Sequence, residues 1–281
     1  MASPATAPRT SFVTAAARVL DLSLGEMIWS RRTILLVLLV GVPVLLAAVI
    51  RILTKTAVFG HLEVNGVMVG GRAIFDVFVG RLFVRFVVPL LGILYGTALI
   101  ADEVEDRTIT YLFTRPIARA SVLVGKYLAY LICTTLFVLP AVMIIYFLLV
   151  PLADIGATFP GLLLDLGLMI VGLAVYGAVF AFVGARMSRP LVIGLVFIFG
   201  WEPVVMLIPG YLRHFTVAYY LQSLAPYTLP TDSSAMSLLQ SLLPSNGPGA
   251  AVCLFWLAVI WVVSLALAGR AVESREYILE P

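Results

Sequence analysis

Long uninterrupted runs of apolar residues constrain this chain more than any other feature. Six such runs cover residues 33–50, 82–101, 127–152, 162–184, 191–208 and 250–268. Because a helix of about 20 apolar residues crosses the roughly 30 Å hydrocarbon layer of a bilayer, each run is long enough, or nearly so, to span a membrane. The strict polar and apolar alternation of membrane β-barrels is absent. The sequence therefore predicts an all-α integral membrane protein with six transmembrane helices in one domain, residues 1–281.

Composition excludes the main alternatives to a membrane protein. Hydrophobic residues make up 62% of the 281 positions and charged residues 12%, whereas soluble domains carry about 45–50% and about 25%. The chain has too few charges to cover a soluble enzyme, and it is too apolar to be intrinsically disordered. Cys133 and Cys253 fall inside apolar runs, where we expect them to pack as small hydrophobic side chains.

The segment before the first run has the pattern of an amphipathic helix. Apolar residues recur at helical spacing from Phe12 to Ile28, while Arg18 and Asp21 fall on the other side. This pattern predicts a helix that lies in the membrane interface and leads into the first span. An ordinary polar tail is the alternative.

The placement of basic residues predicts the orientation of the chain. With the N-terminus inside, the inner segments hold 12 of the 18 Lys and Arg residues and the outer segments hold 6. Because Lys and Arg concentrate in cytoplasmic loops, both termini are predicted to lie in the cytoplasm of a multi-pass protein of the cell membrane. The stretch from Pro209 to Gly249 then lies outside, and its aromatic residues favour short helices on the outer membrane surface.

The most polar stretch joins the second and third runs, from Asp102 to Lys126. Four acidic residues fall within its first five positions, and basic residues follow. Such a run is too costly to sit in hydrocarbon, so it must be a cytoplasmic connector. Glu103 and Arg107 stand four residues apart in the order that supports a short helix. A solvated charged turn is the simpler interpretation of the same residues.

This connector resembles that of type-2 ATP-binding-cassette exporter permeases. The resemblance rests on an acidic pair leaving the second span, a Thr-x-x-Tyr-Leu-x-x-x-Pro-x-x-Arg core and a Gly-Lys pair at the start of the third span. The core residues are Thr108, Tyr111, Leu112, Pro116 and Arg119, and the pair is Gly125 and Lys126. The six-span plan, the N-terminal helix, the outer helical loop and the ending Arg275-Glu276-Tyr277 are similar to that family too.

The resemblance implies roles for the connector. It would be a coupling helix that docks on a separate nucleotide-binding ATPase subunit, with Glu103, Glu105 and Arg107 making charged contacts. Thr108 to Leu112 would supply the packing face. The family works with two permease copies, identical or related, in a bacterial inner membrane. ATP and Mg would bind the partner ATPase, and we expect no cofactor in this chain and no nucleic-acid partner. The transported substrate is not indicated.

The chain carries no ATP-binding motif of its own. A phosphate-binding loop needs G-x-x-x-x-G-K-[ST], but Gly125-Lys126 has Ala120 at the first glycine position and is followed by Tyr127. If ATP drives this protein, another chain binds it.

Two other classes of function compete with an exporter permease. A six-span secondary transporter or channel would need buried ion ligands, and the runs offer mainly Glu202 and Asp165. An intramembrane protease is suggested only by Asp102, Glu103 and Arg107. That chemistry also needs histidines in later spans, whereas the chain's two histidines fall in predicted outer loops, and no cluster of metal ligands is visible. We therefore expect no catalytic residue and no metal site.

A few residues inside the runs are candidates for function. Glu202 lies deep in the fifth run and is either a gate or pathway residue, paired with Arg85 at similar depth, or a structural carboxylate that caps helix amides. Asp165 is expected to be a boundary residue of the fourth span. The spacing of Gly92 with Gly96 predicts close helix packing; Gly177 with Ala181 does the same.

Overall fold

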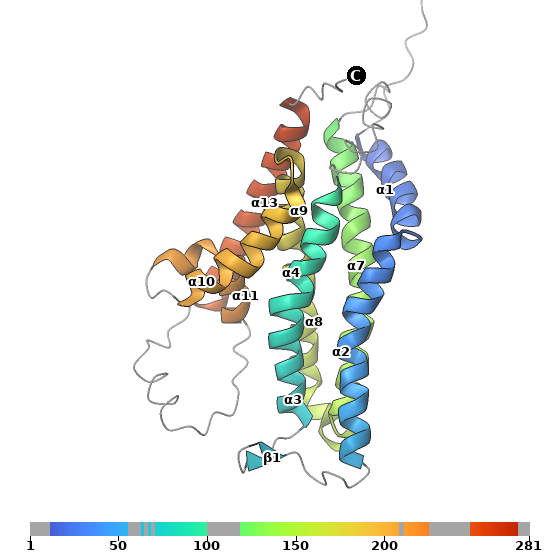
Figure 1. The fold of residues 1–281 in the computed structure, drawn as a ribbon, viewed down its shortest axis with the longest axis vertical. Helices are drawn as coiled ribbons and strands as arrows, with labels where there is room; N and C mark the ends of the chain where they lie inside the picture. The colour runs from blue at the N-terminus through green and yellow to red at the C-terminus, as the bar shows by residue number, and fades with distance from the viewer. Residues whose placement is uncertain are drawn as a thin grey trace, which may run out of the picture.

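The computed structural model is a bundle of long helices (Figure 1). It describes residues 12–55, 63–64, 67–68, 71–99, 119–207, 211–224 and 248–274. Five described helices are long and apolar enough to cross a membrane, and the described strands form one small antiparallel hairpin, β1 (Glu63–Val64) with β2 (Val67–Met68). The prediction of an all-α membrane protein is therefore confirmed, whereas the predicted number of six spans stays a prediction.

Four of the predicted spans correspond to single helices. These are α2 (Arg31–Lys55), α7 (Arg119–Leu149), α8 (Ile155–Arg186) and α13 (Ala250–Ser274). The short 3-10 helix η3 (Leu152–Asp154) joins α7 to α8. Pro43, Pro140 and Pro160 are accommodated inside these helices, as is common in membrane spans.

The second span begins earlier than the sequence predicts. It is a continuous rod made of α3 (Gly71–Val77), η1 (Phe78–Val87), α4 (Val88–Leu91) and η2 (Gly92–Gly96), in which η1 and η2 are wider π-helical turns. The predicted start at residue 82 is wrong because Arg72 and Asp76 interrupt the hydrophobic pattern. In the folded chain these two side chains form an ion pair, and Phe75 and Phe78 between and beyond them are buried.

The fifth predicted span is a shorter helix. It consists of α9 (Pro190–Leu195), the π-helical η4 (Val196–Trp201) and α10 (Glu202–Leu207), close to the predicted 191–208. Its apolar part, Pro190–Met206, is shorter than the five spanning helices. Figure 1 shows α10 set at the side of the bundle, away from α2 and α7.

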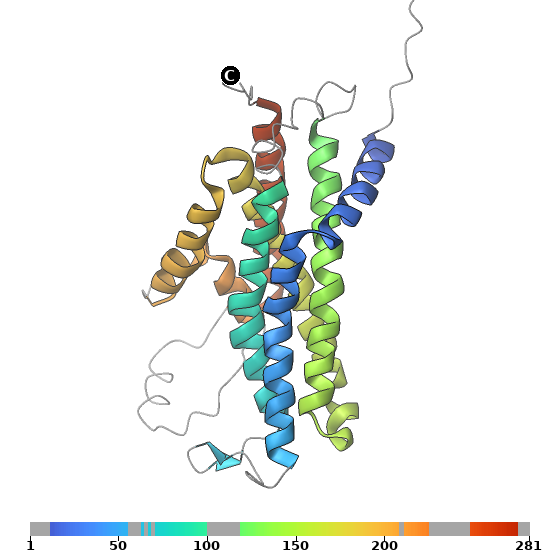
Figure 2. The same ribbon diagram turned by 45° about the vertical axis from the view of Figure 1, so that its right-hand side comes forward.

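The predicted N-terminal helix is present as α1 (Phe12–Ile28). Figure 2 shows it leaving α2 at an angle and lying against α7. Gly125 of α7 allows this approach, because a Cβ there would stand 2.7 Å from the carbonyl oxygen of Ala16. At the junction with α2, the Thr33 hydroxyl donates to the carbonyl of Met27 and lies 3.3 Å from the Tyr95 hydroxyl. Whether α1 lies in the membrane interface stays a prediction.

The segment after the fifth helix is helical but packs inward. It contains the 3-10 helix η5 (Tyr211–Phe215) and α11 (Val217–Leu224). All residues from Val217 to Leu221 are buried, and α11 packs on α13, α8 and η1. The predicted helical character is thus confirmed for these residues, whereas the predicted position on the outer membrane surface stays a prediction. Residues 225–247 of this loop lie outside the described part.

Glycines let the second and fourth spans cross closely. A Cβ on Gly92 would stand 2.8 Å from the Cβ of Tyr176, and one on Gly96 would stand 3.0 Å from the carbonyl oxygen of Gly177. Gly184 packs in the same way against the backbone of Thr97. The small-residue pairs read from the sequence therefore form a helix crossing, as predicted.

Candidate functional site

Glu202 ties three helices together. It lies in the first turn of α10 and is only 5% exposed. The hydroxyl of Tyr176 on α8 donates to it, at 3.0 Å from Oε1 and 2.8 Å from Oε2. The backbone N–H of Ala218 in the first turn of α11 also donates to Oε1, at 3.4 Å. Because the N-terminal end of a helix presents unpaired N–H groups, the carboxylate caps α11 from a neighbouring helix.

This arrangement bears on the two interpretations of Glu202. The capping contact favours the structural interpretation, although the amides it satisfies belong to α11 and not to the turn around Pro203. The same residue also lines a cavity, as a pathway residue would. The two roles are compatible, because each oxygen has a protein partner and the carboxylate still borders open space.

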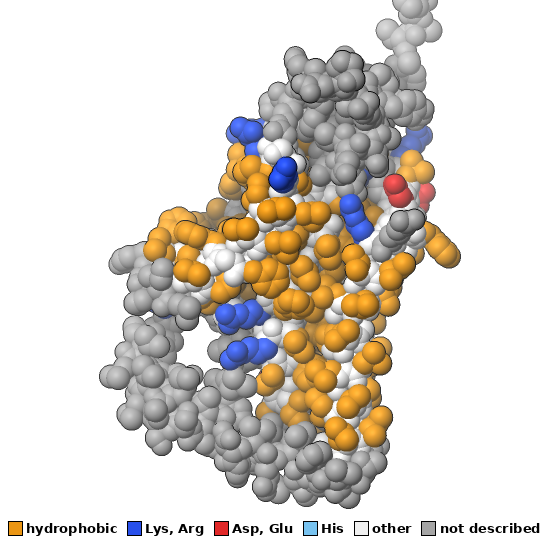
Figure 3. Space-filling model, viewed as in Figure 1, with side chains coloured by type: hydrophobic (Ala, Val, Ile, Leu, Met, Phe, Trp, Pro, Cys, Tyr) orange, Lys and Arg blue, Asp and Glu red, His pale blue; other side chains and the backbone are white. Residues whose placement is uncertain are grey.

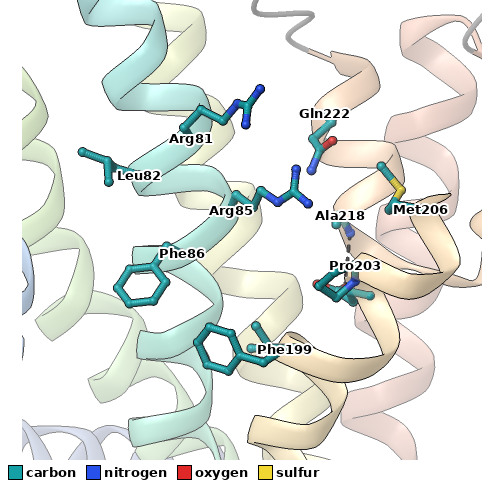
Figure 4. Close-up of a pocket in the computed structure, with 11 residues that line it drawn as sticks. Arg81, Leu82, Arg85, Phe86, Phe199, Pro203, Met206, Ala218 and Gln222 are labelled. Carbon is teal, nitrogen blue, oxygen red and sulfur yellow. Dashed lines mark hydrogen bonds between the residues drawn. The ribbon is translucent and has the colours of Figure 1, made fainter.

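Arg85 lines the same cavity but does not pair directly with Glu202. The cavity has a volume of about 320 Å³ and lies between η1, η4, α10 and α11. Figure 4 shows Arg81 and Arg85 reaching from η1 toward Gln222 of α11. Among the described residues, no salt bridge within 4.0 Å joins Arg85 to Glu202. The hydrogen bonds of the carboxylate go to Tyr176 and Ala218, so the predicted direct contact is absent from this conformation.

Asp165 lies within a helix, and not at a helix end, in an ion cluster whose other two members are partly exposed. Helix α8 begins well before it, and its side chain is 6% exposed. The Nη2 atom of Arg72 donates to Oδ2 of Asp165 at 3.0 Å, and Nε of Arg72 lies 2.9 Å from Oδ1 of Asp76. Gly161 makes room for the guanidinium, which lies 3.2 Å from the place of its missing Cβ. The ion pair between Arg72 and Asp165 links α3 to α8.

The predicted coupling residues lie outside the described part of the chain. This holds for Glu103, Glu105, Arg107, Thr108, Tyr111, Leu112 and Pro116. Arg119 is the first residue of α7, and its side chain is not described. Their roles therefore stay predictions. Among the residues that the structure describes, no group of three or more His, Cys, Asp or Glu side chains could hold a metal ion.

Sequence reasoning misses three residues of the cavity and its border. The hydrophobic pattern puts Arg81 just outside the second span, whereas in the structure Arg81 lies within that span, in η1. Gln222 and Tyr176 carry no charge, so no sequence signal separates them from other residues of their helices. The spacing of Arg81 and Arg85, four apart in a helix, is the available signal that two cations share one face.

Together, the long apolar helices, the glycine crossing and the intramembrane charges define a multi-pass helical membrane protein. A family model described as "ABC-2 family transporter protein" matches residues 18–271, and the chain therefore belongs to the ABC-2 transporter family. The family resemblance drawn from the connector is confirmed. A search of curated proteins found no match to the sequence.

Proposed function

We propose that this protein is the membrane-spanning permease subunit of an ATP-binding-cassette exporter of the type-2 class. The observation that carries the proposal is the family match over residues 18–271, which covers every described spanning helix in whole or in part. The permease works as a pair of identical or related copies with a separate ATPase, which binds ATP and Mg.

The proposed topology has six crossings and both termini in the cytoplasm of a bacterial inner membrane. The shorter helix at Pro190–Met206 supplies the fifth crossing. In support, the start of α1 and the end of α13 lie at the same end of the molecule (Figure 1). A chain with an even number of crossings has this property. The connector after the second span then belongs to the same, inner side, where an ATPase can reach it.

The proposed mechanism passes through the connector, residues 102–120. Glu103, Glu105 and Arg107 would make charged contacts in a cleft on the ATPase, and Thr108 to Leu112 would supply the packing face. Pro116 and Arg119 would complete the connector. Closure of the two ATPases on ATP would then move the spans as packed bodies between inward- and outward-facing states. The chain itself carries out no catalysis in this scheme.

The connector can be tested by reversing its charge. We expect Glu103→Lys combined with Glu105→Lys to abolish co-purification with the proposed partner ATPase, because like charges would face each other at the docking cleft. The matched control is Asp21→Lys with Glu26→Lys, since both acids are exposed on α1 and the same charge is reversed. Unchanged co-purification of the connector variant, with the spans intact, would refute the coupling assignment.

The alternative of a secondary transporter or channel is less well supported. It would depend on Glu202 and Asp165 as free ligands for an ion. Both acids are instead engaged by neighbours, Glu202 by Tyr176 and Asp165 by Arg72. A chain that purifies alone and still transports without any ATPase would favour this alternative.

A further inference from the structure

Two arginines of the second span stand in an unusual environment. Arg81 and Arg85 lie in η1, and both side chains are exposed on the isolated chain. Their neighbours in η1 are apolar, and Phe86 beside them is itself 39% exposed. A charged side chain inside a membrane span is costly unless it has a counter-charge or reaches water. The pair therefore requires an anion or an aqueous opening.

The described protein supplies too little negative charge for this pair. In the part of the chain that the structure describes, neither guanidinium forms an ion pair. The nearest acid of the cavity, Glu202, has its oxygens bound by Tyr176 and Ala218. Arg72 in the same rod shows the contrast, because Asp76 and Asp165 both contact it. The cavity thus carries two cations against one acid, because the hydrogen bonds to Glu202 come from neutral groups and bring no further negative charge.

The cavity has a polar end and an apolar end. Figure 4 shows Arg81, Arg85 and Gln222 directed into the same space, with the rings of Phe86 and Phe199 on another side of it. The two rings lie 5.9 Å apart between centroids and are partly exposed. Figure 3 shows basic side chains set within an otherwise hydrophobic face of the molecule. The cavity has a volume of about 320 Å³, which suits a small head group and not a large solute.

We propose that this cavity binds the phosphate of an acidic phospholipid. The guanidinium groups of Arg81 and Arg85 hold the phosphate oxygens, which planar guanidinium groups bind in pairs. The amide of Gln222 donates to the rest of the head group, and an acyl chain lies along Phe86 and Phe199. Basic pockets between membrane helices on the cytoplasmic side of membranes bind acidic head groups through the same contacts. The site needs neither the ATPase nor transport, so it stands apart from the proposed function.

The test is lipid binding by the purified full chain, measured by native mass spectrometry. Phosphatidylglycerol and phosphatidylcholine are added in parallel, and inorganic phosphate is added as a competitor. We expect the wild-type chain to retain phosphatidylglycerol in preference to phosphatidylcholine. Arg81→Gln with Arg85→Gln should weaken phosphatidylglycerol binding at least about tenfold, since removing even one charge-assisted hydrogen bond weakens binding by about that factor.

The matched control removes the same charge elsewhere. Arg186→Gln with Arg189→Gln removes two exposed arginines, one at the end of α8 and one just before α9, and should leave the lipid preference unchanged. Should the glutamine variant of the cavity fail to fold, Arg81→Lys with Arg85→Lys keeps the charge and should still bind several-fold more weakly.

Three results would overturn the proposal. The wild-type chain could show no preference for phosphatidylglycerol, or the cavity and control variants could lose it equally, which would mean attraction by net charge alone. Inorganic phosphate could also displace the lipid as effectively as phosphatidylglycerol does, which would assign the site to a free anion.

Discussion

At the scale of single residues, Glu202 shows how a carboxylate is kept inside an apolar bundle. Burying a charge is expensive unless hydrogen bonds replace the lost water. Here the hydroxyl of Tyr176 and the N–H of Ala218 both donate to it. The contacts are reciprocal, because the buried hydroxyl gains an acceptor and the first turn of α11 gains a cap. Glu202 therefore links α10 to both α8 and α11 by hydrogen bonds.

Removing this carboxylate should loosen the protein measurably. Glu202→Ala leaves the Tyr176 hydroxyl without its acceptor and the Ala218 N–H without its cap, at a cost of about 1–3 kcal/mol. The thermal unfolding midpoint of the purified protein in detergent measures the loss. Glu273→Ala, at the exposed end of α13, is the control. Equal midpoints for the two variants would mean that the Glu202 contacts contribute no stability.

The sequence can identify Glu202 but not its partners. An acidic residue in an apolar run is a clear signal, whereas Tyr176 and Ala218 lie on other helices, and their approach depends on how those helices cross. The predicted pairing of Arg85 with Glu202 rests on similar depth alone. Depth does not fix rotation about the helix axis, and in the structure Arg85 borders the same cavity without touching the carboxylate.

At the scale of elements, the crossing of the second and fourth spans depends on small residues. Membrane helices associate without a hydrophobic driving force, so close packing of their backbones is the main source of attraction. A Cβ on Gly92 would point at Tyr176 and Phe180 of α8, so the crossing has no room for a methyl group. Tyr130 of α7 packs in turn on Gly177, and its hydroxyl donates to the carbonyl of Leu173 at 2.8 Å.

A larger side chain at this crossing should separate the helices. Gly92→Val places a Cβ within 2.8 Å of Tyr176, and overpacking of this kind costs about 1–3 kcal/mol. Gly41→Val is the control, because Gly41 lies in the middle of α2 with nothing within 4 Å of its Cβ position. Both changes carry the same intrinsic helix propensity. The thermal midpoint should fall for Gly92→Val alone, and a matching fall in both would argue against the crossing.

Helix ends are predicted well where no charged residue lies near them. They are predicted poorly where charged residues pair with each other inside the helix. The fifth helix falls within a residue of its predicted bounds, since no acid or base stands at its ends apart from Arg189. The predicted start of the second span is some ten residues late. In the sequence alone, Arg72 and Asp76 look like the polar residues of a loop outside the membrane. Only the fold brings Asp165 to Arg72, and only then can these charges lie among buried side chains.

At the scale of the whole molecule, the helices alternate in direction between two ends. The link between α7 and α8 lies at one end, around η3, and the link between α8 and α9 lies at the other. The close contact of Gly184 with Thr97 places the last described turn of the second rod at the α8–α9 end. The connector that follows the second span therefore starts from the same end of the molecule as residue 188. Measuring on which side of the membrane residue 188 lies thus also gives the side of the connector.

Labelling of single cysteines from outside intact cells can measure that sidedness. Under the proposed topology, Ala153→Cys in η3 should react with a membrane-impermeant maleimide in intact cells, whereas Ser188→Cys should react only after the membrane is opened. Both positions are exposed, and Cys133 and Cys253 are fully buried, so the background from the native cysteines should be low. The opposite pattern would place the connector outside the cell, beyond the reach of any ATPase, and the coupling mechanism would fall with it.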